Sequence, residues 1–224
     1  MQEIKNKAIE LFGLGDVSIE GALFDLDGVI VDTAKYHYLA WKRLAAELGF
    51  NFTEADNERL KGVSRVRSLE ILLEIGRVTM TAEQKEEAAT RKNTWYVEYL
   101  HHLNETALLS GSKEYLLRLR ENGIRIALGS ASKNAPLILE RLNITSLFDA
   151  IIDGNTVSKA KPDPEVFLKG AAALGLSPDR CVVFEDALAG IEAAKAGGML
   201  AIAVGTPVHL PGADRYINSL TDML

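Results

Sequence analysis

Cysteine is almost absent from this sequence. Only Cys181 occurs among 224 residues, so no internal disulfide can form, and its place in an apolar run predicts a buried strand thiol. The chain also lacks any apolar run of the ~18 residues that a membrane span requires. Its first residues lead into no apolar stretch typical of a signal peptide. We therefore expect a cytoplasmic protein with no membrane partner.

Clusters of lysine and arginine are missing as well. The formal net charge is −6, which makes nucleic acid a poor expectation as a partner. Disorder is excluded as the main state, because hydrophobic residues make up 47% of the chain. No heptad pattern or large apolar stripe is present, so we expect a monomer. The length suits one core domain with a smaller insertion.

Short runs rich in valine, isoleucine and leucine alternate with helical patterns in much of the chain. The expected strands are Gly21–Phe24, Ile124–Leu128, Ala150–Ile152, Cys181–Phe184 and Leu200–Val204, and the helices between them cover residues 112–122, 133–142, 164–174 and 187–196. This alternation predicts an α/β fold with a doubly wound, Rossmann-like parallel sheet covered on both faces. The strand C-termini then share one edge, where such sheets bind ligands.

An all-helical block interrupts that alternation. Helical spacing is predicted for residues 36–48, 53–60, 64–75 and 81–103, with Gly49 as a C-cap and a capping box from Thr81 to Gln84. The sequence thus predicts a core domain of residues 21–33 and 106–224 and a four-helix cap domain of residues 34–105. Residues 1–20 are expected to be an N-terminal extension, as a short surface helix or an added leader.

Two aspartates end the first predicted strand. Asp25 and Asp27 stand two residues apart, so both carboxylates are expected to leave the strand in the same direction. Like charges that close repel unless a cation joins them, and Mg²⁺ with a nearby phosphate would meet that need. Gly28 lets the chain turn sharply after them. Taken alone, the spacing is more typical of an ordinary loop with a pair of solvated aspartates, and the motifs that follow reverse this preference.

Polar groups follow three more predicted strands. Ser130–Asn134 follows the second, Lys161–Pro164 comes shortly after the third, and Glu185 and Asp186 end the fourth. Each is explained separately as a helix cap or helix start. Together at one edge they offer carboxylates for a cation, and hydroxyl, amide and ammonium groups for a phosphate, with a helix N-terminus at Ser132–Asn134. Phosphoryl transfer requires this combination.

The order and spacing of these motifs, from residue 21 to about residue 205, resemble the haloacid dehalogenase superfamily of aspartyl phosphotransferases. The resemblance implies that Asp25 is the nucleophile and Asp27 the general acid/base. It implies that Asp25, the backbone carbonyl of Asp27 and Asp186 hold Mg²⁺, with Glu185 as a further ligand or supporting group. The transferring phosphoryl group would be held by Ser130, the Ala131 amide and Lys161.

Within that superfamily, residues 33–42, 60–65, 91–93 and 130–134 resemble the β-phosphoglucomutases. This implies a second phosphate site, which a sugar bisphosphate intermediate needs, built from Arg65 with Ser132, Lys133 and Asn134. His37 and Lys92 resemble a hinge pair that links cap closure to Asp27. Trp41 is expected to pack at the root of the cap or, as the alternative, to support a sugar ring. The implied substrate contacts are Thr33, His37, Trp41, Lys61, Gly62, Arg65, Lys92, Ala131, Ser132, Lys133 and Asn134.

Three functions remain open from the sequence. The first is conversion of β-D-glucose 1-phosphate to glucose 6-phosphate, with glucose 1,6-bisphosphate as intermediate and activator, although maltose phosphate also fits. The second is a sugar-phosphate phosphatase of the same superfamily, which needs only one phosphate site. The third is a catalytically silent binding protein. The cluster of Arg65 with residues 132–134 argues against the second, and intact Asp25, Asp27, Lys161 and Asp186 argue against the third.

Overall fold

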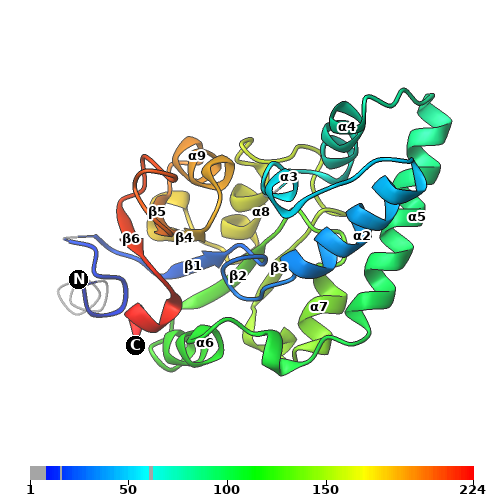
Figure 1. Cartoon of the computed structure of the whole chain (residues 1–224). Coiled ribbons are helices and arrows are strands. Elements are labelled where there is room, and N and C mark those ends of the chain that lie inside the picture. The colour runs from blue at the N-terminus through cyan, green and yellow to red at the C-terminus, as the bar shows by residue number, and fades with distance from the viewer. Residues whose placement is uncertain (1–8, 16, 61–62) are drawn as a thin grey trace. The chain divides into compact units, whose positions relative to one another are not determined.

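The computed structural model describes residues 9–15, 17–60 and 63–224. The chain divides into two compact units. One contains Met1–Asp32 and Asn104–Leu224, and the other contains Thr33–Leu103. The first is built around a sheet and the second contains only helices (Figure 1).

A six-stranded parallel sheet forms the first unit. Its strand order is β3-β2-β1-β4-β5-β6. The strands are β1 (Gly21–Phe24), β2 (Arg125–Gly129), β3 (Ala150–Ile152), β4 (Cys181–Glu185), β5 (Leu200–Val204) and β6 (Arg215–Ile217). The predicted α/β class and the five predicted strands are confirmed, with boundaries within one residue. The edge strand β6 was not predicted, because Arg215–Ile217 does not form the run of valine, isoleucine or leucine that marks the other strands, including the equally short β3.

Helices cover both faces of this sheet. They are α6 (Ser112–Glu121), α7 (Ala135–Arg141), α8 (Glu165–Ala173) and α9 (Leu188–Ala196), with short 3₁₀ turns η1 (Glu105–Ala107), η2 (Thr145–Leu147), η3 (Pro178–Arg180) and η4 (Leu220–Met223). Their positions agree with the predicted helices. Crossover helices on both faces account for strands that are buried along most of their length.

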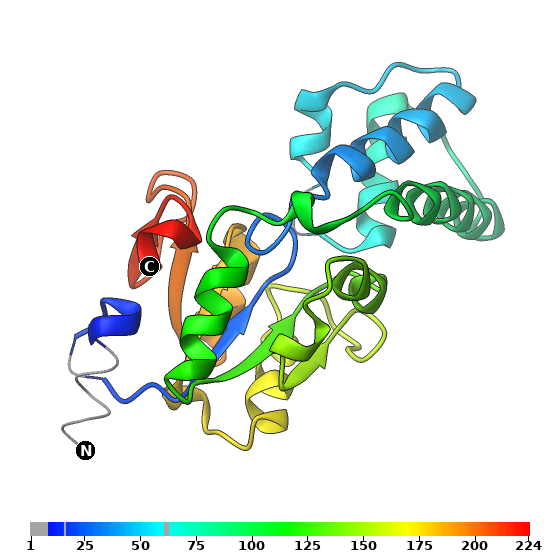
Figure 2. The ribbon, with the colours of Figure 1, turned by 90° about the horizontal axis from the view of Figure 1, so that it is seen from below.

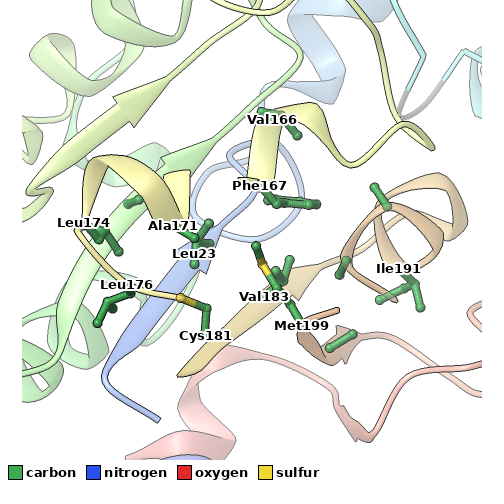
Figure 3. Close-up of a cluster of buried hydrophobic side chains, with 14 of the residues drawn as sticks. Leu23, Val166, Phe167, Ala171, Leu174, Leu176, Cys181, Val183, Ile191 and Met199 are labelled. Carbon is green, nitrogen blue, oxygen red and sulfur yellow. The ribbon is translucent and has the colours of Figure 1, made fainter. Parts of the chain in front are cut away.

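Successive residues of β1 and β4 point to opposite faces. Leu23 and Val183 join a cluster with Phe167 and Ala171 of α8 (Figure 3). Gly170 lets α8 approach closely, since a Cβ there would meet the Leu23 side chain. Phe24 and Phe184 stack at 4.5 Å between ring centroids on the other face, where Tyr115 of α6 meets both rings edge-on. Figure 2 shows α6 running along this face of the sheet.

The described part of the N-terminal segment contains a helical turn at residues 9–12, which leaves Ile9 and Glu10 exposed and packs its other side against the sheet unit. Leu11 and Phe12 are almost fully buried. The ring of Phe12 lies 6.4 Å from that of Phe184, and the Leu11 carbonyl accepts a hydrogen bond of 2.8 Å from the Tyr115 hydroxyl. Leu11 and Phe12 therefore add to the aromatic layer on the α6 face of the core.

Four helices form the second unit: α2 (Ala34–Glu47), α3 (Glu54–Glu58), α4 (Arg65–Gly76) and α5 (Ala82–Leu100). The predicted helical block is confirmed. Helices α2 and α4 pack on α5 through buried side chains that include Leu44, Leu72 and Ala88. Because these residues recur at helical spacing, each helix presents an apolar face to its neighbours.

Local capping fixes the ends of these helices. The predicted capping box is confirmed: Gln84 N donates to Thr81 Oγ1 at 3.2 Å, and Thr81 N donates to Gln84 Oε1 at 2.9 Å. A second box joins Thr53 and Asp56 at the start of α3. Gly49 has a φ of 84° directly after α2, as expected for a residue that ends a helix. Among the described residues, no helix is long and apolar enough to cross a membrane.

Candidate active site

The carboxyl ends of three neighbouring strands bring the predicted core residues together. Phe24 pairs with Leu128 of β2 and with Phe184 of β4, so Asp25, Gly129 and Glu185 end adjacent strands at the same level. Asp25 N donates to the Phe184 carbonyl at 3.0 Å, and Ser130 N donates to the Ile152 carbonyl at 2.9 Å. The sheet register therefore fixes the backbone from which these side chains leave.

Lys161 lies between two acidic side chains. Its Nζ is 2.6 Å from Asp25 Oδ1 and also contacts Glu185 Oε1. The Lys161 side chain is only 3% exposed. Burial opposes its charge, but the carboxylates of Asp25 and Glu185 outweigh that effect and raise the pKa of Lys161. The lysine is therefore a fixed positive charge beside Asp25.

Asp25, Glu185 and Asp186 form a possible metal centre. Each offers a carboxylate oxygen, and these oxygens lie within 4.8 Å of one another. Burial and the negative charge of neighbouring carboxylates raise the pKa of Glu185 to about 7 and that of Asp186 to about 8. A divalent cation would relieve this repulsion, so the donor set fits a metal that prefers oxygen ligands. The Asp27 side chain is not part of this set.

A tight loop carries Asp27. Gly28 N donates to the Val31 carbonyl at 2.8 Å, and Ile30 N donates to the Leu26 carbonyl at 2.9 Å. Gly28 has a φ of 84°, and a Cβ there would overlap the Asp186 carboxylate. Glycine is therefore required for both conformation and space. Asp27 is half-buried and close enough to Asp186 to raise the pKa of that carboxyl group.

The turn after β2 holds Ser130 in a fixed orientation. Ser130 Oγ accepts a hydrogen bond of 3.1 Å from Ser132 N, and Ser132 Oγ accepts one of 3.2 Å from Asn134 N. A hydroxyl group that accepts this bond can still donate its own hydrogen, so Ser130 keeps a donor available for a phosphate oxygen. We expected this helix to begin at residue 133. Helix α7 begins at Ala135 instead, with Asn134 as its N-cap, so residues 132–134 form a turn that precedes the helix.

One side chain that contacts Lys161 was not predicted from the sequence. Phe167 of α8 places its ring centroid 4.7 Å from Lys161 Nζ. The aromatic face supports a cation, and the fully buried ring also limits the positions that the lysine can take. Phe167 follows Lys161 by six residues in an ordinary helix pattern. That pattern does not show whether the Phe167 ring contacts a lysine or only packs in the core.

In the helical unit, Lys92 and His37 lie together as predicted. Lys92 Nζ is 3.0 Å from His37 Nδ1, and the His37 ring stacks on Tyr96 at 4.0 Å between centroids. Burial, then Lys92 and Arg65, hold the pKa of His37 well below its usual range. The imidazole is therefore neutral, and Nδ1 accepts a hydrogen bond from the Lys92 ammonium.

Other predicted cap residues are also placed. Trp41 is 2% exposed, and Lys92 Nζ lies 4.4 Å from its ring centroid, so its ring packs within the helical unit. Arg65 is the first residue of α4 and is half-buried, and burial lowers its pKa. Thr33 is buried at the start of α2. Lys61 and Gly62 lie outside the described residues.

The predicted site residues thus form two groups. Asp25, Asp27, Lys161, Glu185, Asp186 and residues 130–134 belong to the sheet unit. Thr33, His37, Trp41, Arg65 and Lys92 belong to the helical unit. The second phosphate site, for which both units supply residues, stays a prediction.

Comparison with known proteins agrees with the geometry of the sheet edge. A sequence model described as haloacid dehalogenase-like hydrolase matches residues 19–198. The chain belongs to this family. It is 44% identical to β-phosphoglucomutase of Bacillus subtilis (strain 168), over 92% of each chain. It is also 32% identical to a phosphorylated carbohydrates phosphatase of Thermotoga maritima, over 81% of this chain and 82% of that protein.

Solved structures include a similar protein. The crystal structure of β-phosphoglucomutase from Clostridium difficile has a TM-score of 0.87 and 39% identity, and the match covers 92% of this chain and 93% of that one. The family, the sheet topology and the buried Asp25–Lys161–Glu185 group identify the chain as an enzyme of the phosphotransferase type. The resemblance deduced from the sequence motifs is therefore confirmed at the level of family, fold and enzyme class.

Proposed function

We propose that this enzyme interconverts β-D-glucose 1-phosphate and glucose 6-phosphate. The observation that carries the proposal is the pairing of Asp25 with Lys161 beside two further carboxylates at the sheet edge. This is a site that can transfer a phosphoryl group to a carboxylate. The sugar is proposed from the similarity, over nearly the whole chain, to a protein named β-phosphoglucomutase.

In the proposed reaction, an Asp25 carboxylate oxygen attacks phosphorus, and the bond from phosphorus to the leaving oxygen breaks. This produces an aspartyl-phosphate and splits one difficult step into two easier ones. Asp27 donates a proton to the leaving sugar oxygen, and in the other half-reaction takes one from the attacking hydroxyl. Lys161 and Ser130 stabilise the anionic oxygens of the transferring group.

The metal is proposed to be Mg²⁺. Asp25, Glu185 and Asp186 would hold it, with the Asp27 carbonyl as a further oxygen ligand. When bound, it supplies positive charge that offsets the repulsion between phosphate and the carboxylates. The residues of the chain then have to orient Asp25 for in-line attack and to exclude water.

A mutase requires a sugar bisphosphate to bind in two orientations. We propose that glucose 1,6-bisphosphate is this intermediate and that Arg65 of the helical unit, with Ser132, Lys133 and Asn134, binds its non-reacting phosphate. A guanidinium group suits this role, because it can donate two parallel hydrogen bonds to one phosphate. Closure that involves His37 and Lys92 would protect the aspartyl-phosphate from water.

A sugar-phosphate phosphatase is the second candidate. The 32% identity to a phosphorylated carbohydrates phosphatase favours it, because the same sheet edge would serve both reactions. In a phosphatase, water attacks the aspartyl-phosphate, and free phosphate leaves. The two candidates differ in the second acceptor and not in the first step.

A two-product assay tests the proposal. The enzyme is incubated with Mg²⁺, β-D-glucose 1-phosphate and a trace of glucose 1,6-bisphosphate, and glucose 6-phosphate and free phosphate are followed together. We expect glucose 6-phosphate with little free phosphate. Free phosphate alone would establish the phosphatase, and neither product would overturn both candidates. An assay without the bisphosphate serves as control, and we expect it to show a slow start.

A further inference from the structure

Lys161 belongs to a loop that has no regular structure of its own. The loop runs from Asp153, after β3, to Pro164, before α8. Its lysine must nevertheless hold Nζ within 2.6 Å of Asp25 Oδ1. A long flexible side chain on an irregular loop would lose that position without additional support, since positioning is most of what phosphoryl transfer requires.

Glu165, in the first turn of α8, holds the backbone of this loop. Its carboxylate accepts hydrogen bonds from Ser158 N at 3.0 Å, from Lys159 N at 2.8 Å and from Ser158 Oγ at 2.8 Å. Two consecutive backbone amides and a hydroxyl therefore converge on one side chain. The last of these amides is two residues before Lys161.

Lys169, one turn further along α8, completes the arrangement. Its Nζ lies 2.6 Å from Glu165 Oε1 and donates to the Thr156 carbonyl, also at 2.6 Å. The bond from Lys169, with those from Ser158 and Lys159, lowers the pKa of Glu165 to about 2. The carboxylate is therefore ionised throughout the range in which an enzyme is assayed. Two side chains of one helix thus hold the loop backbone at Thr156, Ser158 and Lys159.

The same helix also supports the end of the Lys161 side chain. Phe167 lies between Glu165 and Lys169 in sequence, and its ring is 4.7 Å from Lys161 Nζ. Helix α8 is itself anchored to the sheet through Phe167 and Ala171 (Figure 3). A rigid element therefore connects the sheet to the lysine at two points, through the loop backbone and through the ammonium group.

We propose that Glu165, with Lys169, is a positioning residue for phosphoryl transfer, which holds the Thr156–Lys159 backbone so that Lys161 reaches Asp25 and the transferring group. It touches no reacting atom and acts through Lys161. The inference rests on the proposed phosphoryl-transfer chemistry but does not depend on which sugar is the substrate.

The test is a double-mutant cycle between Glu165 and Lys161 in the full-length enzyme with Mg²⁺. Hydrolysis of p-nitrophenyl phosphate is measured, since a simple ester reports on the sheet edge without a second phosphate site. Glu165→Gln should lower kcat about ten- to a hundredfold and change KM less, because Lys161 acts mainly on the transition state. In a Lys161→Ala background, assayed at high enzyme concentration, the same substitution should change kcat less than about twofold.

Asp214→Asn is the matched control. Asp214 also accepts bonds from a lysine, Lys195 at 2.8 Å, and from a backbone amide, Ala201 N at 2.8 Å. Asp214 lies directly before β6, at the N-terminal ends of β5 and β6 and not at the carboxyl ends where the candidate site lies. The control should lower the melting temperature about as much as Glu165→Gln and leave kcat unchanged. Lys169→Met, on an exposed side chain, is a second probe that should lower kcat in the same direction by a smaller factor.

Equal losses from Glu165→Gln in both backgrounds would overturn the inference, because a general structural effect does not depend on Lys161. Unchanged kcat in both Glu165→Gln and Lys169→Met would also overturn it. If Glu165→Gln does not fold, the cycle with Lys169→Met decides by the same criterion. A wild-type enzyme that transfers no phosphoryl group from any ester or sugar phosphate would overturn the proposed function and, with it, this inference.

Discussion

The two units of this protein each bury a lysine, and the two lysines have different surroundings. Lys161 of the sheet unit lies between the carboxylates of Asp25 and Glu185. Lys92 of the helical unit contacts a neutral imidazole and lies 4.4 Å and 4.7 Å from the ring centroids of Trp41 and Tyr96. The Lys161 ammonium group contacts two carboxylates, and the contacts described for the Lys92 ammonium group include two aromatic faces and an imidazole nitrogen.

This difference shows how one residue type serves two purposes. Carboxylates keep Lys161 charged and place that charge where anionic oxygens of a phosphoryl group would develop. Aromatic faces contact Lys92 and support its charge, and burial together with Lys92 lowers the pKa of His37. We therefore expect the first lysine to act on the reaction itself and the second to act on the arrangement of the helical unit.

Within the comparison of the two lysines, the largest expected effect comes from replacing each with methionine in separate variants. Lys161→Met should lower phosphoryl transfer about 10²- to 10³-fold, because it removes a preorganised charge beside the reacting centre. Lys92→Met should lower isomerisation no more than about tenfold, since it changes closure and not the charge at phosphorus. Steady-state rates with β-D-glucose 1-phosphate measure both. Equal losses would contradict the division of roles between the two units.

The second prediction separates the two phosphate sites. Arg65→Ala should lower isomerisation about 10- to 100-fold, the value of one or two charge-assisted hydrogen bonds, and should change p-nitrophenyl phosphate hydrolysis little. Arg67→Ala is the control on the same helix, because Arg67 is exposed and pairs only with Glu70 and Glu74 among the interactions described for it. Comparable losses of both activities in Arg65→Ala would remove the second site from the proposal.

The third prediction concerns pH and metal. The pKa values of Asp186 and Glu185 are raised in the folded enzyme to about 8 and about 7, so above pH 4 the unfolded chain holds fewer protons than the folded one. Stability of the metal-free enzyme should therefore fall as pH rises from 5 to 9, with a melting temperature lower by about 5 °C or more. Added Mg²⁺ should restore most of this loss at pH 9.

Asp186→Asn supplies the control for that experiment. It removes the carboxylate with the most raised pKa, so it should flatten the fall in melting temperature with pH and weaken the effect of Mg²⁺. If the melting temperature of the metal-free wild-type enzyme is constant or rises from pH 5 to 9, repulsion within the carboxylate cluster is not what controls stability in this range.

Much of the site was predictable because it depends on chain order and strand periodicity. Asp25, Ser130 and Glu185 each follow an apolar run, and parallel strands bring such positions to one edge. A cation site beside Asp25 was expected from the repulsion between closely spaced carboxylates together with the polar groups after the other strands, and the structure places Asp25, Glu185 and Asp186 there. The fold class followed from the same alternation of strands and helices.

The remainder depends on packing that a single sequence does not reveal. The sequence does not predict that Phe167 contacts Lys161 or that Phe12 contacts Phe184. These phenylalanines look like other apolar residues until the folded structure shows which groups they touch. The strand β6 was missed because Arg215–Ile217 does not form an apolar run, and only its pairing with β5 defines it. Tertiary contacts, not local propensity, decide these features.

The smallest expected effect tests how the helical unit is held together. Thr81→Ala should lower the free energy of unfolding by about 0.5–2 kcal/mol, because it removes the acceptor for Gln84 N at the start of α5. Thr81 caps the start of α5 and has no proposed role in the reaction, so kcat should be unchanged. Chemical denaturation followed by circular dichroism measures the first quantity. A loss of activity without a loss of stability would contradict a purely structural role.

The most direct test of the account is to identify the residue that carries the phosphoryl group. The wild-type enzyme is mixed with Mg²⁺ and β-D-glucose 1-phosphate, quenched during turnover and treated with hydroxylamine, which converts an acyl phosphate to a hydroxamate. Peptide mass spectrometry then locates the modification, with Asp25→Asn as control. We predict modification at Asp25 in the wild type and none in the variant, which should also lose at least about 10⁴-fold in rate. Modification at another residue, or full turnover by Asp25→Asn, would contradict the account.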